Sequence, residues 1–215
     1  MPVMPANDCA ALDLLECRAD FPERVTDVSL RWVQLDDDPE LEAILVVEAE
    51  AERAYAGYVF DKQDRWKLVG SFWCERSCDS DSFLRVKKLT SDSPPLLLVH
   101  RDLGGSAQTL MTTTAYHLRG GKLSQVLEIP IYEHISITPE RITHTQVLSS
   151  QDRLLIHTAR QTVPAQVRNS CEVYRWSPTL YRFELSVADR AQYCDSKTGK
   201  PIPNKSFATG LPAYP

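Results

Sequence analysis

The sequence predicts an all-β protein of three four-stranded antiparallel units, with a short N-terminal helix and an extended C-terminal tail. From residue 27 onward, apolar and polar side chains alternate in short runs separated by polar turns, which is the pattern of half-buried strands. The outline of one such stretch, YVFDKQDRWKLVGSF from Tyr58, also returns from Tyr116 and again from Tyr174, each time after 58 residues. A repeated strand-turn-strand pattern predicts repeated structural units.

The first 24 residues favour a helical cap, because Ala10, Leu14 and Leu15 have near-helical spacing and Pro22 would end the helix. Twelve strands are then predicted, at 27–35, 42–50, 54–60, 65–73, 82–89, 94–103, 108–118, 122–131, 141–150, 153–163, 170–176 and 180–188. Gly120 and Gly121 can supply the positive φ of a tight hairpin turn.

The expected domain organisation is a cap (1–24), a single β domain (25–190) and an extended or disordered tail (191–215) rich in Pro, Gly and Lys. The β domain divides into units of about 25–80, 81–136 and 137–190. Four-stranded units of this size are typical of propeller blades, but three of them cannot readily close a ring. An open array, a merged sandwich or barrel, and a ring completed by two chains are therefore the alternatives.

In each unit a polar loop precedes an aliphatic strand: LDDDPELEAILVV, LTSDSPPLLLVH and LSSQDRLLIH. This signal resembles the FG-GAP/VCBS type of propeller repeat over roughly residues 27–190, although the D-x-D-x-D-G loop of those repeats is incomplete here. The resemblance implies a calcium loop, for which Asp36, Asp38 and Glu40 would supply oxygen ligands from alternate positions. The alternative is an acidic turn in solvent.

The six cysteines form three sequence-local pairs, Cys9–Cys17, Cys74–Cys78 and Cys171–Cys194. Their spacing does not fit a zinc knuckle or a Cys-x-x-Cys redox pair, so disulfides are predicted, with unpaired thiols as the alternative. Disulfides would place the protein in the periplasm or outside the cell. The first residues lack the basic and apolar regions of a leader, so an exported protein would have lost it; a cytoplasmic location is the alternative.

Composition excludes two classes of partner. A net charge of −5 and a pI near 5.6 argue against nucleic acid, and the longest aliphatic run, AILVV, is too short for a membrane span. No nucleophile elbow, H-E-x-x-H motif or P-loop is present, so an enzyme is the less favoured interpretation.

Trp66 and Trp176 lie beside matching turns in the first and third units and could form part of a partner-binding face, or simply pack the core. The favoured function is a non-enzymatic binding module of the bacterial envelope or secreted space that engages a protein or glycan. An acidic surface suits a basic partner, as for an inhibitor or immunity protein. The alternatives are a hydrolase with converging carboxylates and a cytosolic scaffold, and open sheet edges make a homodimer plausible.

Overall fold

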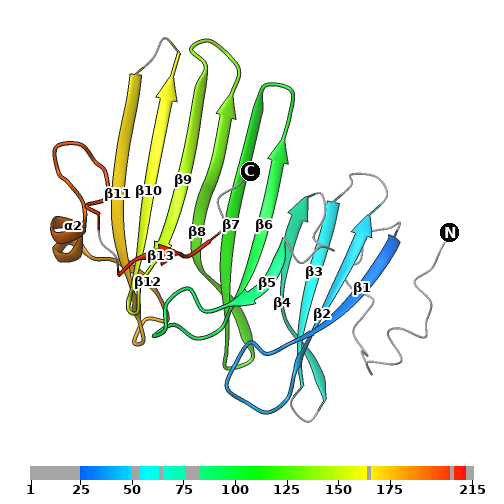
Figure 1. Cartoon of the computed structure of the whole chain (residues 1–215). Coiled ribbons are helices and arrows are strands. Elements are labelled where there is room, and N and C mark those ends of the chain that lie inside the picture. Colours follow the sequence, from blue (N-terminus) through cyan, green and yellow to red (C-terminus); the bar gives the residue numbers. More distant parts are fainter. Residues whose placement is uncertain are drawn as a thin grey trace.

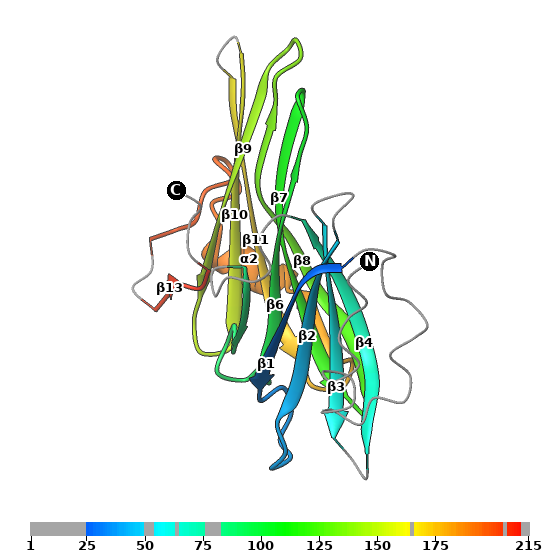
Figure 2. The same ribbon diagram turned by 90° about the vertical axis from the view of Figure 1, so that its right-hand side faces the viewer.

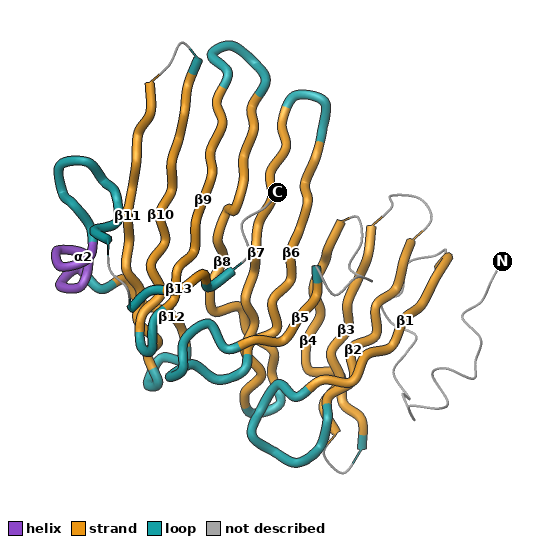
Figure 3. The backbone as a smooth tube through the Cα atoms, in the orientation of Figure 1, coloured by secondary structure: helices purple, strands orange, loops and turns teal. Residues whose placement is uncertain are grey.

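The structure is a computed structural model that describes residues 25–49, 54–62, 65–75, 83–163, 166–203 and 206–211. These residues form two antiparallel sheets, neither closed on itself, and within each sheet successive strands of the chain lie side by side, except for the short last strand (Figures 1 and 3). The all-β prediction is therefore confirmed. The predicted helical cap over 1–24 lies outside the described residues.

The smaller sheet has four strands. They are β1 (Val25–Val33), β2 (Glu42–Ala49), β3 (Ala54–Lys62) and β4 (Trp66–Glu75). The larger sheet has nine strands. They are β5 (Leu84–Lys87), β6 (Leu96–Gly104), β7 (Gln108–Arg119), β8 (Lys122–Ile135), β9 (Arg141–Ser149), β10 (Arg153–Thr162), β11 (Gln166–Ser177), β12 (Arg182–Leu185) and the two-residue β13 (Ala208–Thr209), which pairs with β9.

Each of the twelve predicted strands overlaps an observed one, because the period of two was read from residues that alternate between the faces of a sheet. The hairpin between β7 and β8 turns at Gly120 and Gly121, whose φ angles are 57° and 71°. The last prediction runs too far: after β12 the chain forms the helix α2 (Val187–Tyr193). The hydroxyl of Ser186 caps this helix by accepting a hydrogen bond from the backbone N–H of Asp189.

The three expected units are not three separate sheets. Residues of the first unit form the smaller sheet, whereas β8 pairs with β9 and so joins the second and third units into the larger one. Tyr58, Tyr116 and Tyr174 lie in the third strand of each group of four, in β3, β7 and β11. Their surroundings differ, however, because they pack against three different apolar clusters.

The smaller sheet packs with one face on the β6–β8 region of the larger sheet (Figure 2). Ile44, Val59 and Phe72 from the smaller sheet meet Leu97 and Val99 of β6 in this core. The alternate residues of β6, Leu96 and Leu98, belong to a second cluster on the opposite face. Because the first four residues of β6 are buried on both faces, that part of the strand is a continuous apolar run instead of an alternating one.

The end of the chain is attached to the larger sheet at two points. A disulfide joins Cys171 of β11 to Cys194, which follows α2, and β13 adds to β9. Within the described ranges, no helix has the length and apolar character needed to cross a membrane.

Candidate functional site

Three carboxylates meet at one end of the smaller sheet. Asp36 comes from the loop after β1, Glu42 opens β2 and Asp61 lies near the end of β3. Since Ala43 pairs with Phe60, Glu42 and Asp61 are side by side on neighbouring strands. One carboxylate oxygen from each of the three lies within 4.8 Å of the other two.

The loop that carries Asp36 is held by its own polar groups. The side-chain amide of Gln34 donates to the backbone oxygens of Asp36 at 2.9 Å and of Asp38 at 2.7 Å. The Oδ1 of Asp36 accepts the N–H of Asp38 at 3.0 Å, and the Oδ1 of Asp38 accepts the N–H of Glu40 at 2.9 Å. Successive turns of this kind fix the direction in which Asp36 points.

Of the three predicted calcium ligands, the structure therefore places one in the carboxylate group. Asp36 joins Glu42 and Asp61, whereas Asp38 and Glu40 are not members of the group. The sequence reasoning missed Glu42 and Asp61. A signal for Glu42 was present, because strand alternation puts it on the same face as the core residues Ile44 and Val46.

Glu42 is the most enclosed of the three carboxylates. It is 0% exposed, and its Oε2 accepts the N–H of Leu35 at 2.5 Å. Its Oε1 is buried and has no hydrogen-bond partner. Burial, reinforced by the neighbouring carboxylate of Asp36, raises the pKa of Glu42 from 4.5 to about 7. Burial likewise raises the pKa of Asp36, with the carboxylates of Asp38 and Asp61 adding to the effect.

This arrangement suits a proton or a cation better than a substrate. A glycosidase needs two carboxyl groups that flank a bond of the substrate. Glu42 and Asp61 are only 0% and 3% exposed, so a sugar cannot lie between them. The group therefore gives no support to the hydrolase alternative.

A groove lies where the two sheets meet along β1 and β5. It encloses about 770 Å³, and its lining includes Trp32, Val33, Ile44, Leu84, Val86 and Leu97. The floor residues Ile44, Leu84 and Leu97 are buried members of the core between the sheets, so the groove is the open side of that core. Its size falls within the range of ordinary ligand sites.

Both strands that border the groove, β1 and β5, are edge strands of their sheets. The backbone of β5 offers its free edge to the groove. Because the N–H of His100 donates to the carbonyl of Phe83 at 2.8 Å, the backbone groups of Phe83 and Arg85 face β6. Those of Leu84 and Val86 then face outward, and the carbonyl of Leu84 accepts a long 3.4 Å contact from Arg31 of β1.

The structure does not bring the two predicted partner-binding tryptophans together. The ring of Trp66 lies 5.4 Å from that of Trp32 on the smaller sheet, with the ammonium of Lys62 5.9 Å above it. Trp176 lies on the larger sheet, where its ring meets those of His117 at 5.6 Å and Phe183 at 5.3 Å. Trp176 therefore packs against a core cluster.

Cys171 and Cys194, one of the three predicted pairs, form a disulfide with an S–S distance of 1.98 Å. Cys9, Cys17 and Cys78 lie outside the described residues, as does the side chain of Cys74. Pairing cysteines that are near in the sequence gave this bond correctly, because Cys171 and Cys194 lie only 23 residues apart in elements that follow closely along the chain.

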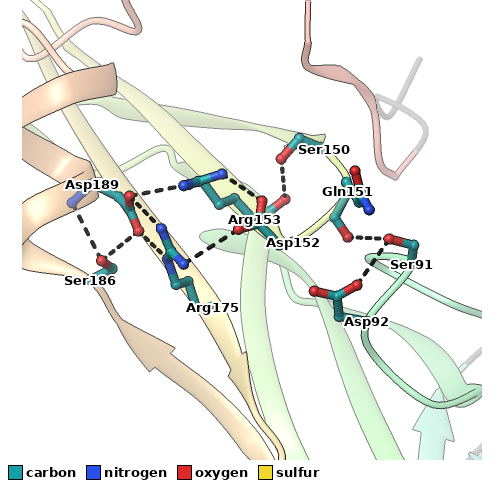
Figure 4. A network of polar contacts seen from close by, with 9 residues as sticks. All are labelled: Ser91, Asp92, Ser150, Gln151, Asp152, Arg153, Arg175, Ser186 and Asp189. Carbon is teal, nitrogen blue, oxygen red and sulfur yellow. Dashed lines mark hydrogen bonds and ion pairs between the residues drawn. The ribbon is translucent and has the colours of Figure 1, made fainter.

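A polar network fastens α2 to the larger sheet (Figure 4). The side chain of Asp189 is only 6% exposed. Its carboxylate accepts hydrogen bonds from Arg153 at 3.1 Å, from Arg175 at 2.9 Å and from the hydroxyl of Ser186 at 2.6 Å. The Arg175 guanidinium, together with Ser186 and Arg153, lowers the pKa of Asp189 well below its usual range. The side chains of Arg153, Arg175 and Ser186 all bind the Asp189 carboxylate, so this network acts as a structural anchor for α2.

Comparison with known proteins adds no relative: a scan against protein-family models finds no match, and neither the curated proteins nor the solved structures contain a similar chain. The FG-GAP/VCBS-like resemblance consequently stays a prediction. Function has to be argued from the groove and the carboxylate group themselves.

Proposed function

We propose that the chain is a non-enzymatic binding module that holds an extended segment of a protein partner in the groove between β1 and β5. The observation that carries this proposal is the meeting of two sheet edges over one apolar floor. The proposal is independent of the carboxylate group.

The backbone supplies the first part of the argument. A strand at the edge of a sheet presents unpaired N–H and C=O groups, and peptide segments bind such edges as an added strand. The N–H of Leu84 and both backbone groups of Val86 point outward for this pairing, and a bound segment would replace the long contact of Arg31 with the carbonyl of Leu84. A protein segment fits the groove better than a glycan does, because only a polypeptide can continue the ladder.

Side chains supply the second part. An added strand would direct alternate residues toward the floor formed by Ile44, Leu84 and Leu97. Val33 of β1 lines the groove beside this floor and packs against the same core, so it offers a further apolar contact. The expected ligand is therefore a segment with apolar residues at every second position.

The Cys171–Cys194 disulfide supports an oxidising compartment, and with it the periplasmic or secreted location, over the cytosolic scaffold. The finer part of the fold prediction also remains a proposal: the strands form three four-stranded repeat units. The position of Tyr58, Tyr116 and Tyr174 in the third strand of each group of four supports it.

The test is selection of random peptides of about nine residues, roughly the length of a long strand, followed by affinity measurement on purified protein. We expect binders with alternating apolar residues, and NMR shifts at the amides of Leu84 and Val86. Val33→Ser should weaken binding about tenfold, as expected for the loss of one apolar contact of about 1.4 kcal/mol. Trp32→Ala is the matched control, because Trp32 is the neighbouring residue of β1 but its ring lies on the other face of the sheet, against Trp66.

A second pair of variants tests the backbone. Val86→Pro removes the outward N–H without breaking the ladder to β6, whereas Val86→Ala shortens the side chain and keeps the N–H. Binding should fall further in the proline variant. Peptides that shift residues elsewhere, or equal effects of the two Val86 variants, would refute strand addition. A dimer in solution that Val33→Ser dissociates would show that a second copy fills the groove.

A further inference from the structure

We propose that Asp36, Glu42 and Asp61 form a binding site for a divalent cation, with Ca²⁺ as the ion of best fit. This inference concerns a different place from the peptide groove and does not depend on it. It also differs from the calcium loop expected from the sequence, since two of its three ligands come from strands.

The distances fit a shared ion. Oxygens that surround one Ca²⁺ lie at about 2.3–2.6 Å from it, so opposite ligands are about 4.6–5.2 Å apart. The three carboxylates, each with one oxygen within 4.8 Å of the others, already meet this limit. Mg²⁺ needs about 2.0–2.1 Å and strict octahedral geometry, whereas Ca²⁺ accepts the less regular geometry of ligands from one loop and two strands.

The second observation is the Oε1 of Glu42. This oxygen is buried and has no hydrogen-bond partner, while the other oxygen of the same carboxylate accepts the N–H of Leu35. Glu42 is 0% exposed, so bulk water does not reach this oxygen. A buried carboxylate oxygen that lacks a donor is costly, and a cation supplies the missing interaction.

The ligand chemistry narrows the choice of ion. All three groups are carboxylates, and hard cations prefer oxygen ligands, whereas zinc and copper favour nitrogen or sulfur. Asp36 is partly exposed and so leaves a path for the ion from solvent. The remaining coordination positions would be filled by water, as is usual for calcium.

An ion at this position would join the loop after β1 to the ends of β2 and β3. Because an ion that binds only the folded protein raises its stability, this effect can be measured by thermal unfolding.

The test is thermal unfolding at pH 8 after treatment with EDTA, with Ca²⁺ then added to about 10 mM, above the dissociation constants of the weakest protein sites. The midpoint of the natural protein should rise with Ca²⁺ and continue to rise with its logarithm. Glu42→Gln should melt above the natural protein in EDTA, because it removes a buried charge, and should show at least tenfold weaker Ca²⁺ binding by calorimetry. Glu40→Gln is the control: it changes an exposed carboxylate of the same loop and should respond as the natural protein does.

If Glu42→Gln does not fold, NMR of the natural protein with substoichiometric Mn²⁺ replaces it, and broadening should be confined to residues around Asp36, Glu42 and Asp61. An unchanged midpoint in Ca²⁺, Mg²⁺ and Mn²⁺ would overturn the proposal. Equal calcium responses of Glu42→Gln and Glu40→Gln would overturn it as well.

Discussion

The Cys171–Cys194 disulfide offers a direct test of how the end of the chain is held. It closes a segment of sequence separation 23 that contains the end of β11, β12 and α2. Both cysteines are buried, at 1% and 6% exposure, and pack with Leu155 and Val173. Replacing both by alanine removes the cross-link while leaving apolar side chains in that cluster.

The expected cost follows from the loop length. Closing a loop of about 24 residues lowers the entropy of the unfolded chain by about 12 cal/mol/K, which is about 3.4 kcal/mol at 25 °C. The lost sulfur contacts add to this figure. A domain of ordinary stability has about 5–15 kcal/mol in total, so the double variant should stay folded but be clearly weakened.

Urea unfolding followed by tryptophan fluorescence measures this cost, with the free energy of unfolding compared between the natural protein and the Cys171→Ala/Cys194→Ala variant. The slope with urea should rise slightly in the variant, because its unfolded chain is less constrained. Reductant added to the variant serves as the control and reports only on the remaining cysteines. A loss below about 1 kcal/mol would refute the reasoning, since the unfolded chain would then keep these residues together without the bond.

Three further predictions concern other parts of the sheets. Gly57→Ala places a Cβ 2.1 Å from the buried ring of Phe72 and should lower the free energy of unfolding by about 1–3 kcal/mol, whereas Gly105→Ala, with its nearest atom at 3.8 Å, should change it little; equal urea midpoints would contradict this. Burial lowers the pKa of His100 from 6.5 to about 4, so the unfolded chain takes up a proton first and stability should fall as pH drops from 6.5 towards 4, by about 2 kcal/mol after allowance for partial exposure. His100→Gln should flatten this dependence in urea titrations at pH 7 and 5, and an unchanged slope would exclude His100 as the cause. The pKa of Asp189 is lowered on folding, so its ionised carboxylate stabilises the fold fully above pH 3.8, and this stabilisation is lost as the pH falls through the lowered pKa. Asp189→Asn should lower the free energy of unfolding by about 2–3 kcal/mol at pH 7. A smaller loss of this free energy at pH 7 than at pH 3 would be inconsistent with the anchor.

The strands were predictable because alternation is a local property of the sequence. Local sequence also carries information about burial. The continuous apolar run LLLV in β6 is typical of a strand buried on both faces, and Leu96 to Val99 are all 0% exposed. Which strands pair across the unit boundaries is not local. The pairing of β8 with β9 follows from a short connection, whereas β4 and β5 end different sheets.

The candidate sites were predictable only in part for the same reason. Asp36 was noticed because it lies in an acidic run, but Glu42 and Asp61 are 19 residues apart and meet only through the register of β2 and β3. The groove is still harder to foresee, since it depends on how the edge of one sheet lies against the edge of another. Trp66 and Trp176 occupy equivalent places in the sequence, yet they belong to different sheets with different neighbours.

The unbroken order of the strands has a consequence for how the protein can form and vary. Every strand from β6 to β12 pairs with the strand before it, as do β2 to β4 in the smaller sheet, so nearly all ladder contacts are local in sequence. Folding can then proceed hairpin by hairpin as the chain emerges from the ribosome, with a small entropic cost at each step. A sheet that grows in this way has no fixed width, because no strand must return to close it. We therefore expect that inserting or deleting one hairpin would leave the register of the remaining strands unchanged, because neighbouring strands in the sheet are also neighbours in the chain.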